Sequence, residues 1–401
     1  MSIVVPSDAS VVETKAEVAS TTSRVQLAYL DGLRGICAIY VVLGHIYVAL
    51  KFFSQDVAPP NILMAFLSIF NVGQTAVDIF IVLSGYCLMI PVIRSNGTMR
   101  GGILQYLRRR ATRILPPYYA ALVISLLLIA LRQALIPEDP SQSNDFRLDV
   151  LLTHLFVVHN WSEISIHAID PPMWSVATEW QIYFLFPLFL LPIWRRFGTL
   201  ASIAAGFALG FAPHFLLNGY LDASFPWFVG LFALGMAAAH INFSEHPQII
   251  MLRQRVPWGP LALVLWVLTI GFLASHRGWY STHQWIADPI IGVATMCLLI
   301  YCTRFLTTSQ SGRAPVAFNI LNSGWAVALG TFSYSIYLIH YPLMILFWNV
   351  MMQFQMSSLA RAGMMLAIYF PLSLVASYLF HLAFERHFMP GHLHQKRSGA
   401  R

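Results

Sequence analysis

The chain has 401 residues, of which 57% are hydrophobic and only 10% are charged, and its mean hydropathy is +0.65. Soluble globular domains carry about 25% charged residues, so this composition excludes an ordinary soluble protein and indicates an integral membrane protein. The net charge of +7 invites a nucleic-acid partner, but the basic residues lie where membrane topology would put them, and none is expected.

The N-terminal two dozen residues are polar and contain neither the apolar core nor the cleavage site of a signal peptide. We therefore expect a disordered cytosolic leader at 1–24, a membrane domain at 25–390 and a cytosolic tail at 391–401. The four cysteines fall inside or at the end of apolar stretches, so neither a disulfide framework nor a zinc or haem site is expected.

Ten apolar stretches are long enough to cross a bilayer as helices, which predicts an all-α polytopic membrane protein. They run approximately over residues 31–52, 74–93, 114–132, 174–193, 199–217, 222–241, 257–275, 285–303, 329–350 and 363–385. Two shorter apolar pieces, 61–72 and 150–159, are expected to be interfacial or re-entrant, and 314–328 is a third such candidate.

The lysines and arginines divide unevenly between the two sides that this arrangement defines. Ten spans place both termini on one side, and 19 of the 24 basic residues fall on that side. Because cytoplasmic loops carry an excess of Lys and Arg, both termini are predicted to be cytoplasmic. The expected location is the plasma (inner) membrane, with the lipid bilayer as a partner.

The first span carries two ionisable residues, Arg34 and His45, eleven positions apart. On an α-helix that spacing places both side chains on one face, separated by about 16 Å along the axis. An ionisable group in lipid is costly unless it is partnered, so it marks a candidate functional site. The pattern predicts a titratable base near mid-membrane with a cation at the cytoplasmic surface.

Three further ionisable groups are expected inside the bundle. Asp78 and Glu179 each follow the outer start of a span by about five residues, which places them about 7–8 Å deep, whereas His45 lies about 12 Å deep and His340 near the middle of its span. We expect these groups to share a water-filled cavity in the outer half of the membrane. A structural role stays open for each, for example a helix-dipole interaction for Asp78.

Two more sets of residues are candidates for binding. Arg110 and Arg113 lie one turn apart on one helix face directly before a span, which suits phosphate groups arriving from the cytosol, although they can also be topology anchors. Cavity-lining or helix-packing roles are open for residues on two other spans: Trp174, Ser333, Tyr334, Tyr337 and His340.

The same residues lie in six motifs that resemble those of the acyltransferase-3 family of membrane O-acyltransferases. An arginine, ten intervening residues and a histidine characterise the first helix of that family, as in Arg34 and His45. The other five matches occur in the expected order: Val77-Asp78-Ile79-Phe80-Ile81-Val82-Leu83-Ser84-Gly85-Tyr86, Arg109-Arg110-Ala111-Thr112-Arg113, Met173-Trp174-Ser175-Val176-Ala177-Thr178-Glu179-Trp180, Gly330-Thr331-Phe332-Ser333-Tyr334-Ser335-Ile336-Tyr337-Leu338-Ile339-His340-Tyr341-Pro342 and Phe384-Glu385-Arg386.

Two small departures from the family pattern are visible. The family commonly has two adjacent acidic residues in the fourth motif, so only Glu179 is carried over, and His387 stands where a proline is common after Arg386. The resemblance implies transfer of an acyl group, usually acetyl, from cytosolic acyl-CoA to a hydroxyl of a carbohydrate or glycolipid acceptor. Acetyl-CoA is then a co-substrate, and neither a permanently bound cofactor nor a metal is expected.

A mechanism follows as a hypothesis. Arg110 and Arg113 hold the CoA phosphates with Arg34 near the entry, and the pantetheine arm threads up the bundle toward His45. His45 acts as general base on the acceptor hydroxyl, and Glu179 or Asp78 fixes its tautomer. A covalent acyl-histidine relay remains an alternative.

Two other classes of function are alternatives to an acyltransferase. Intramembrane histidines and carboxylates also suit a proton-coupled secondary transporter, although the two halves of the chain lack convincing repeats and Arg110 and Arg113 would have no evident task. A scaffold or lipid sensor fits poorly because it would not need ionisable groups at depth. Acetyl-CoA binding from the cytosolic side would distinguish an acyltransferase from a carrier.

Overall fold

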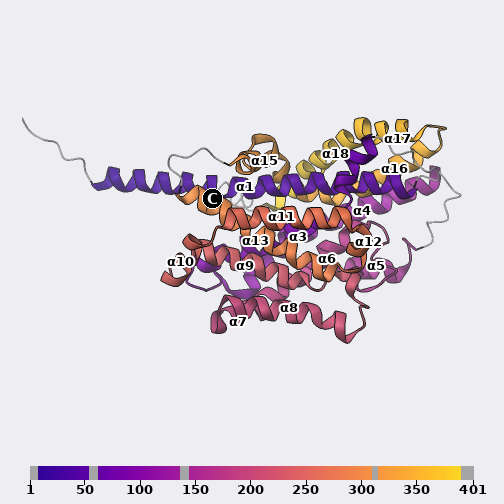
Figure 1. Ribbon diagram of the computed structural model, residues 1–401. Helices are drawn as coiled ribbons and strands as arrows, with labels where there is room; N and C mark the ends of the chain where they lie inside the picture. The colour runs from indigo at the N-terminus through magenta and orange to yellow at the C-terminus, as the bar shows by residue number, and fades with distance from the viewer. Residues whose placement is uncertain (1–7, 54–61, 136–143, 309–314, 390–401) are drawn as a thin grey trace, which may run out of the picture.

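The computed structural model describes residues 8–53, 62–135, 144–308 and 315–389, and the secondary structure in these ranges is helical without any strand. The α-helices in chain order are α1 (Asp8–Val48), α2 (Ile62–Leu67), α3 (Gln74–Ile93), α4 (Gly102–Leu135), α5 (Leu148–Leu155), α6 (Trp174–Leu185), α7 (Leu191–Phe197), α8 (Thr199–Leu216), α9 (Phe228–Phe243), α10 (Pro247–Arg255), α11 (Trp258–Ser275), α12 (Arg277–Thr282), α13 (Gln284–Thr308), α14 (Val316–Leu321), α15 (Gly324–Thr331), α16 (Ser333–Met352), α17 (Ser358–Met364) and α18 (Phe370–Ala383). The fold is an all-α bundle, as predicted (Figure 1).

Ten helical stretches in the described part of the chain are long and apolar enough to cross a membrane, which confirms the predicted spans. Their bounds are Ala28–Phe52, Leu63–Ile93, Gly102–Leu135, Pro171–Phe197, Thr199–Leu216, Asp222–Phe243, Trp258–Ser275, Gln284–Thr307, Ser333–Met352 and Ser358–Ala383. Two of them pass through a π-helical turn, η6 (Phe186–Leu190) between α6 and α7 and η8 (Met365–Tyr369) between α17 and α18.

The segments outside the predicted spans are mostly short helices. The interfacial pieces form α2, α5, α14 and α15. Residues 8–24 were predicted as a disordered leader, but they form the start of α1, which reaches beyond the rest of the bundle in Figure 1. The first seven residues and the predicted tail at 391–401 lie outside the described residues.

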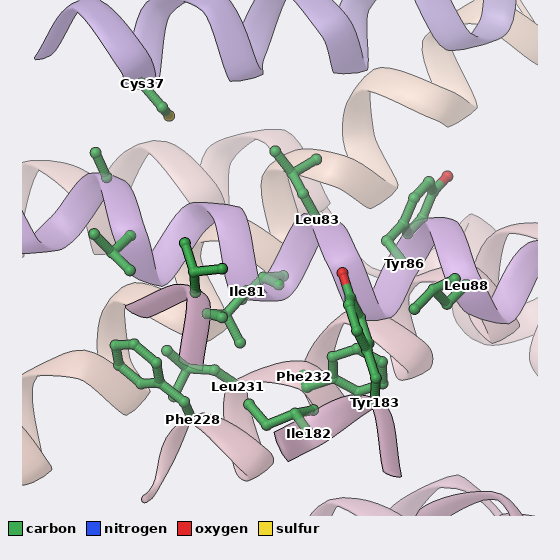
Figure 2. Packing of buried hydrophobic residues seen from close by; sticks show 14 of the residues in the cluster. Cys37, Ile81, Leu83, Tyr86, Leu88, Ile182, Tyr183, Phe228, Leu231 and Phe232 are labelled. Carbon is green, nitrogen blue, oxygen red and sulfur yellow. The ribbon is translucent and has the colours of Figure 1, made fainter. Parts of the chain in front are cut away.

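Helices α3 and α9 form the centre of the bundle. Most residues of both helices are buried, so protein and not lipid surrounds them on nearly all sides. Figure 2 shows α3 between α1, which carries Cys37, and labelled side chains of α6 and α9: Ile182, Tyr183, Phe228, Leu231 and Phe232. By contrast, α11 exposes Leu263, Val267 and Ile270 on its outer face, as expected for contact with lipid.

Glycine allows α3 and α9 to touch through their backbones. A Cβ atom added at Gly235 of α9 would lie 2.0 Å from the carbonyl oxygen of Val82, and one at Gly85 of α3 would lie 2.1 Å from the carbonyl oxygen of Phe232. Small residues at such a crossing permit the close van der Waals packing that holds membrane helices together. The two glycines therefore set the distance between the central helices.

We expect Gly235→Ala to destabilise the protein by about 1–3 kcal/mol, because the added methyl group must separate two backbones. The matched control is Gly271→Ala in α11, where an added Cβ would contact nothing within 4 Å. The thermal unfolding midpoint of the purified protein in nanodiscs measures both. Equal midpoints for the two variants would contradict this account of the crossing.

Candidate functional site

A cavity of about 150 Å³ lies inside the bundle and is lined by α1, α3, α4, α6 and α16; we call it the central cavity. Its polar lining combines guanidinium, carboxylate, hydroxyl and thiol groups from all five helices: Arg34, Ser84, Cys87, Arg110, Arg113, Ser175, Glu179, Tyr183, Ser333, Tyr334 and Tyr337. Seven of these residues were predicted as site residues from the sequence. The structure therefore brings together side chains that lie up to 303 positions apart in the chain, from Arg34 to Tyr337.

A second hollow of about 430 Å³, the basic vestibule, adjoins the central cavity. Arg34, Cys87 and Arg113 line both spaces, so the two meet at these residues. The vestibule adds Arg94 and Arg100, which sequence reasoning counted only as topology markers. A ligand that fills both spaces would have its anionic part among arginines.

The arginines are only partly neutralised by protein carboxylates. Arg34 pairs with Asp31 at 2.6 Å between Nη1 and Oδ1 and donates from Nη2 to Sγ of Cys87 at 3.0 Å. Arg110 and Arg113 make no hydrogen bond to any residue in the described ranges, and the buried Nε of Arg110 has no partner there. Arg113 also lies in electrostatic range of Arg34 and Arg110, and of the carboxylate of Glu385. A cluster of arginines in which two make no hydrogen bond to the protein is typical of a phosphate site.

The Arg34–Cys87 contact shows which residues of α1 and α3 lie at the same height along the two helix axes. Helices α1 and α3 run in opposite directions, so eleven residues up α1 from Arg34 to His45 correspond to eleven residues back along α3 from Cys87, to Ala76. The next residue, Val77, is the first α3 residue in the cavity lining. The central cavity thus extends over about 16 Å, from the level of Arg34 to the level of His45.

His45 meets a second histidine at that level. Nδ1 of His45 lies 2.9 Å from Nε2 of His340, and the two rings stack with centroids 5.0 Å apart. The ring of Tyr341 packs edge-on against His45 at 5.2 Å. Neither histidine lines the central cavity; the ring of Tyr337, which does, lies 6.1 Å from that of His340.

The hydrogen bonds of His340 assign the tautomers of both neutral histidines. Nδ1 of His340 lies 2.9 Å from the carbonyl oxygen of Ile336, which can only accept, so this nitrogen carries the proton. Nε2 of His340 must then accept, and Nδ1 of His45 must donate to it. The remaining nitrogen, Nε2 of His45, is left with a free lone pair and can act as a base.

Asp78 does not lie beside His45. Its carboxyl group is fully buried next to Asp288 of α13, on the side of α3 away from the cavity. Asp288 accepts from Nε1 of Trp227 at 2.8 Å and from the Tyr280 hydroxyl at 3.3 Å. The predicted contact between His45 and this carboxylate is therefore absent from the structure, because Val77 and not Asp78 shares the cavity-facing stripe of α3 with Ile81 and Ser84.

Glu179 lines the central cavity, but on the face of α6 that also carries Ser175 and Tyr183. Oε1 accepts from the Tyr183 hydroxyl at 2.6 Å, and that hydroxyl accepts in turn from Ser84 at 2.9 Å. No hydrogen bond to His45 is made, so the carboxylate does not set the tautomer of the histidine here. It faces the arginine cluster instead of forming part of an outer cluster with His45.

Of the other predicted cavity-lining residues, Tyr337 lines the central cavity and Trp174 does not. Tyr337 donates to the carbonyl oxygen of Pro172 at 2.7 Å and accepts from Ser175 at 2.5 Å, which closes the cavity at the His45 level. Trp174 does not line the cavity; it stacks on Phe225 at 4.4 Å. Sequence reasoning missed Ser84, Ser175, Cys87 and Tyr183, although helical spacing from Val77 and Glu179 would have identified most of them.

Residues 144–173, which we call the cap, connect α4 to α6 at the His45 end of the bundle. His154 and His159 are buried in it with rings stacked 4.1 Å apart. Burial lowers the pKa of His154 to about 4, and burial together with the neighbouring His154 lowers the pKa of His159 to about 3. Both imidazoles are therefore neutral in the folded cap.

Acidification should load the unfolded cap with protons that the folded cap does not bind. Each histidine then loses stabilisation as the pH falls below about 6.5, by about 2 kcal/mol at pH 5. Because a buried Asp170 with a raised pKa acts in the opposite direction, the test is a difference between variants. As the pH falls from 7 to 5, we expect the amide-exchange protection of the cap in His159→Phe to increase relative to that in wild type. An identical pH response in both proteins would contradict the assignment.

Comparison with known proteins matches the chain to a family described as an acyltransferase domain, over residues 27–384. Among curated relatives, Acyltransferase MdmB from Streptomyces mycarofaciens is 24% identical and the match covers 90% of this chain and 91% of the relative. Peptidoglycan O-acetyltransferase OatA from Listeria monocytogenes is 23% identical over 81% of this chain and 50% of its own length. O-acetyltransferase OatA from Staphylococcus aureus is 29% identical over 42% of this chain and 25% of its own. No solved structure matches.

Proposed function

The chain belongs to the acyltransferase family and is an O-acyltransferase embedded in a membrane; on that basis we propose that it transfers an acetyl group from acetyl-CoA to a hydroxyl of a carbohydrate-type or glycolipid acceptor. The single observation that carries the proposal is the cavity that leads from the clustered arginines, two of which make no hydrogen bond in the described residues, to Tyr337, next to the histidine pair of His340 and His45. The family assignment favours an enzyme over the carrier alternative.

The donor binds from the arginine end. The phosphates of acetyl-CoA lie in the basic vestibule near Arg34 and Arg113, with Arg110 at the base of the central cavity, and the pantetheine arm extends along the cavity. An extended pantetheine has a length comparable to the 16 Å rise between the Arg34 and His45 levels. The thioester would then reach the outer end of the cavity beside Tyr337, whose ring must move aside to expose His45.

The chemistry uses the tautomer that His340 imposes. Nε2 of His45 takes the proton of the acceptor hydroxyl as the hydroxyl oxygen attacks the thioester carbon. The C–S bond breaks, and the proton passes to the CoA sulfur. His340 accepts from Nδ1–H of His45 throughout and stabilises the imidazolium that forms. The same free nitrogen could instead attack the thioester itself, which would give an acyl-histidine intermediate.

The acceptor enters from the opposite side of the membrane. The excess of basic residues at the arginine end supports cytoplasmic termini in a plasma (inner) membrane protein. The cap then faces the outside of the cell. A glycan acceptor of the kind named for the relative, a peptidoglycan O-acetyltransferase, would be found there. CoA remains cytosolic, and only the acyl group crosses.

Acetyl-CoA binding and CoA release by the purified protein in nanodiscs test the proposal. We expect Arg113→Ala to weaken acetyl-CoA binding about 10- to 100-fold, because a charge-assisted phosphate contact is lost. Arg255→Ala, an exposed arginine at the same end of the bundle, is the matched control and should bind normally. A well-folded wild-type protein that binds no acetyl-CoA would overturn the donor assignment.

A further inference from the structure

The carboxyl group of Asp170, at the end of the cap, is a buried titratable group that the mechanism does not use. Asp170 is 1% exposed, and neither of its carboxyl oxygens has a hydrogen-bond partner among the residues the structure describes. Only its backbone is bonded, to Ala168 and Met173. Buried polar groups are almost always hydrogen-bonded, so a partnerless carboxyl suggests a partner that binds from outside.

Asp170 lies between the cap and the histidine pair. It directly precedes Pro171 and Pro172, and the carbonyl oxygen of Pro172 accepts from Tyr337 at the closed end of the central cavity. Its carboxyl group lies in electrostatic range of Tyr337 and of Tyr341, the ring that packs against His45. Asp170 therefore lies near the two tyrosines that flank the histidine pair, on the cap side of the bundle.

The backbone before Asp170 is held in an unfavourable conformation. Ile169 has φ of 62°, which is rare for a β-branched residue, and its N–H donates to Oδ1 of Asp145 at 2.7 Å. Strain of this kind persists where the surrounding structure demands it, commonly at binding sites. Here the residue with this conformation directly precedes the buried Asp170.

The burial also influences the chemical form of the group. Removal from water raises the pKa of the Asp170 carboxyl well above its usual range, which favours the neutral carboxylic acid over the carboxylate. A carboxylic acid has one O–H donor and an acceptor oxygen, the pair of functions that a hydroxyl group can satisfy at once.

We propose that Asp170 binds the acceptor by hydrogen-bonding a second hydroxyl of a polyol whose reacting hydroxyl lies at Nε2 of His45. The inference rests on the proposed function and extends it, because it makes a hydroxyl other than the acylated one a requirement for recognition. Sugars meet that requirement and simple alcohols do not. Removing the carboxyl group should therefore reduce discrimination between them without impairing use of the donor.

Competition between two soluble probes measures this discrimination. Methyl β-glucoside offers several hydroxyls, whereas tetrahydropyran-2-methanol keeps the same ring and only the primary hydroxyl. With acetyl-CoA as donor, we expect wild type to acetylate the glucoside about 10-fold or more in preference, and Asp170→Leu to lose most of that preference. Asp170→Asn, which keeps a donor and an acceptor, should retain it. Asp149→Leu, an exposed cap residue paired with Arg147, is the matched control.

Hydrolysis of acetyl-CoA in the absence of either probe, measured as CoA release, reports on donor binding and use. Its rate should be the same in all three variants as in wild type. A preference that persists in Asp170→Leu, or a parallel loss of CoA release, would overturn the inference alone. No CoA release by wild type with either probe present would overturn the proposed function and the inference with it. If the leucine variant does not fold, infrared difference spectroscopy replaces the competition experiment. The carboxylic-acid band of Asp170 is identified as the band present in wild type and absent in Asp170→Asn. Methyl β-glucoside must shift this band, and an unshifted band contradicts the proposal.

Discussion

Replacing His45 with alanine should reduce acetyl transfer by about 10²- to 10⁴-fold, the usual contribution of a general base, while acetyl-CoA still binds. The two effects separate because the arginines that would hold the CoA phosphates lie about 16 Å from the imidazole along α1. The measurement is CoA release and product formation at saturating acceptor probe, alongside a direct binding titration with acetyl-CoA.

Two controls make the His45 result specific. The Arg113→Ala variant should show the opposite profile, with weakened binding and a turnover that recovers at high acetyl-CoA. Incubating wild type with radiolabelled acetyl-CoA in the absence of acceptor tests the acyl-histidine route, which predicts label retained on the protein and lost in His45→Ala. Full transfer activity in His45→Ala would refute its role as base or as nucleophile.

Replacing His340 with phenylalanine should lower kcat by about 10- to 100-fold with little change in the KM for acetyl-CoA. The variant keeps a ring of similar shape but removes the acceptor for Nδ1–H of His45. A hydrogen bond to a charged group contributes about 1.5–3 kcal/mol, and it matters most when His45 becomes an imidazolium in the transition state. His340 is thus a positioning residue.

The conservative variant His340→Gln separates positioning from packing. Its amide oxygen can take the place of Nε2 and accept from His45, so we expect it to recover a large part of the activity lost in His340→Phe. Thermal midpoints of both variants check that the fold is intact. Equal losses of kcat in the two variants, or an increase in KM alone, would show that His340 acts through packing.

The architecture was predictable because it depends on local composition. Ten apolar stretches follow directly from the cost of exposing polar groups to lipid, and all ten spans are present in the structure. The same holds for Arg34, Arg110, Arg113 and Glu179, whose helical spacing and motifs predicted an internal site and which all line the central cavity.

The partners of the ionisable groups were not predictable in this way. Successive residues of a helix are rotated by about 100°, so a shift of one position separates Val77, which lines the cavity, from Asp78, which is buried near Asp288. Depth estimates placed Asp78, Glu179 and His45 at similar levels, but equal depth does not imply the same side of a helix. The hydrogen-bond partner of His45 came from His340 instead, 295 positions away.

The sequence by itself determined that the chain is a ten-span membrane protein with an arginine and a histidine on one face of its first helix, because hydropathy and helical periodicity are properties of neighbouring residues. Only the tertiary structure decided which groups meet: His340 with His45, Glu179 with Tyr183 near the arginines, and Asp170 alone beneath the cap. Those contacts depend on the rotation and crossing of helices that are far apart in the chain, as at Gly85 and Gly235, and packing between helices sets them.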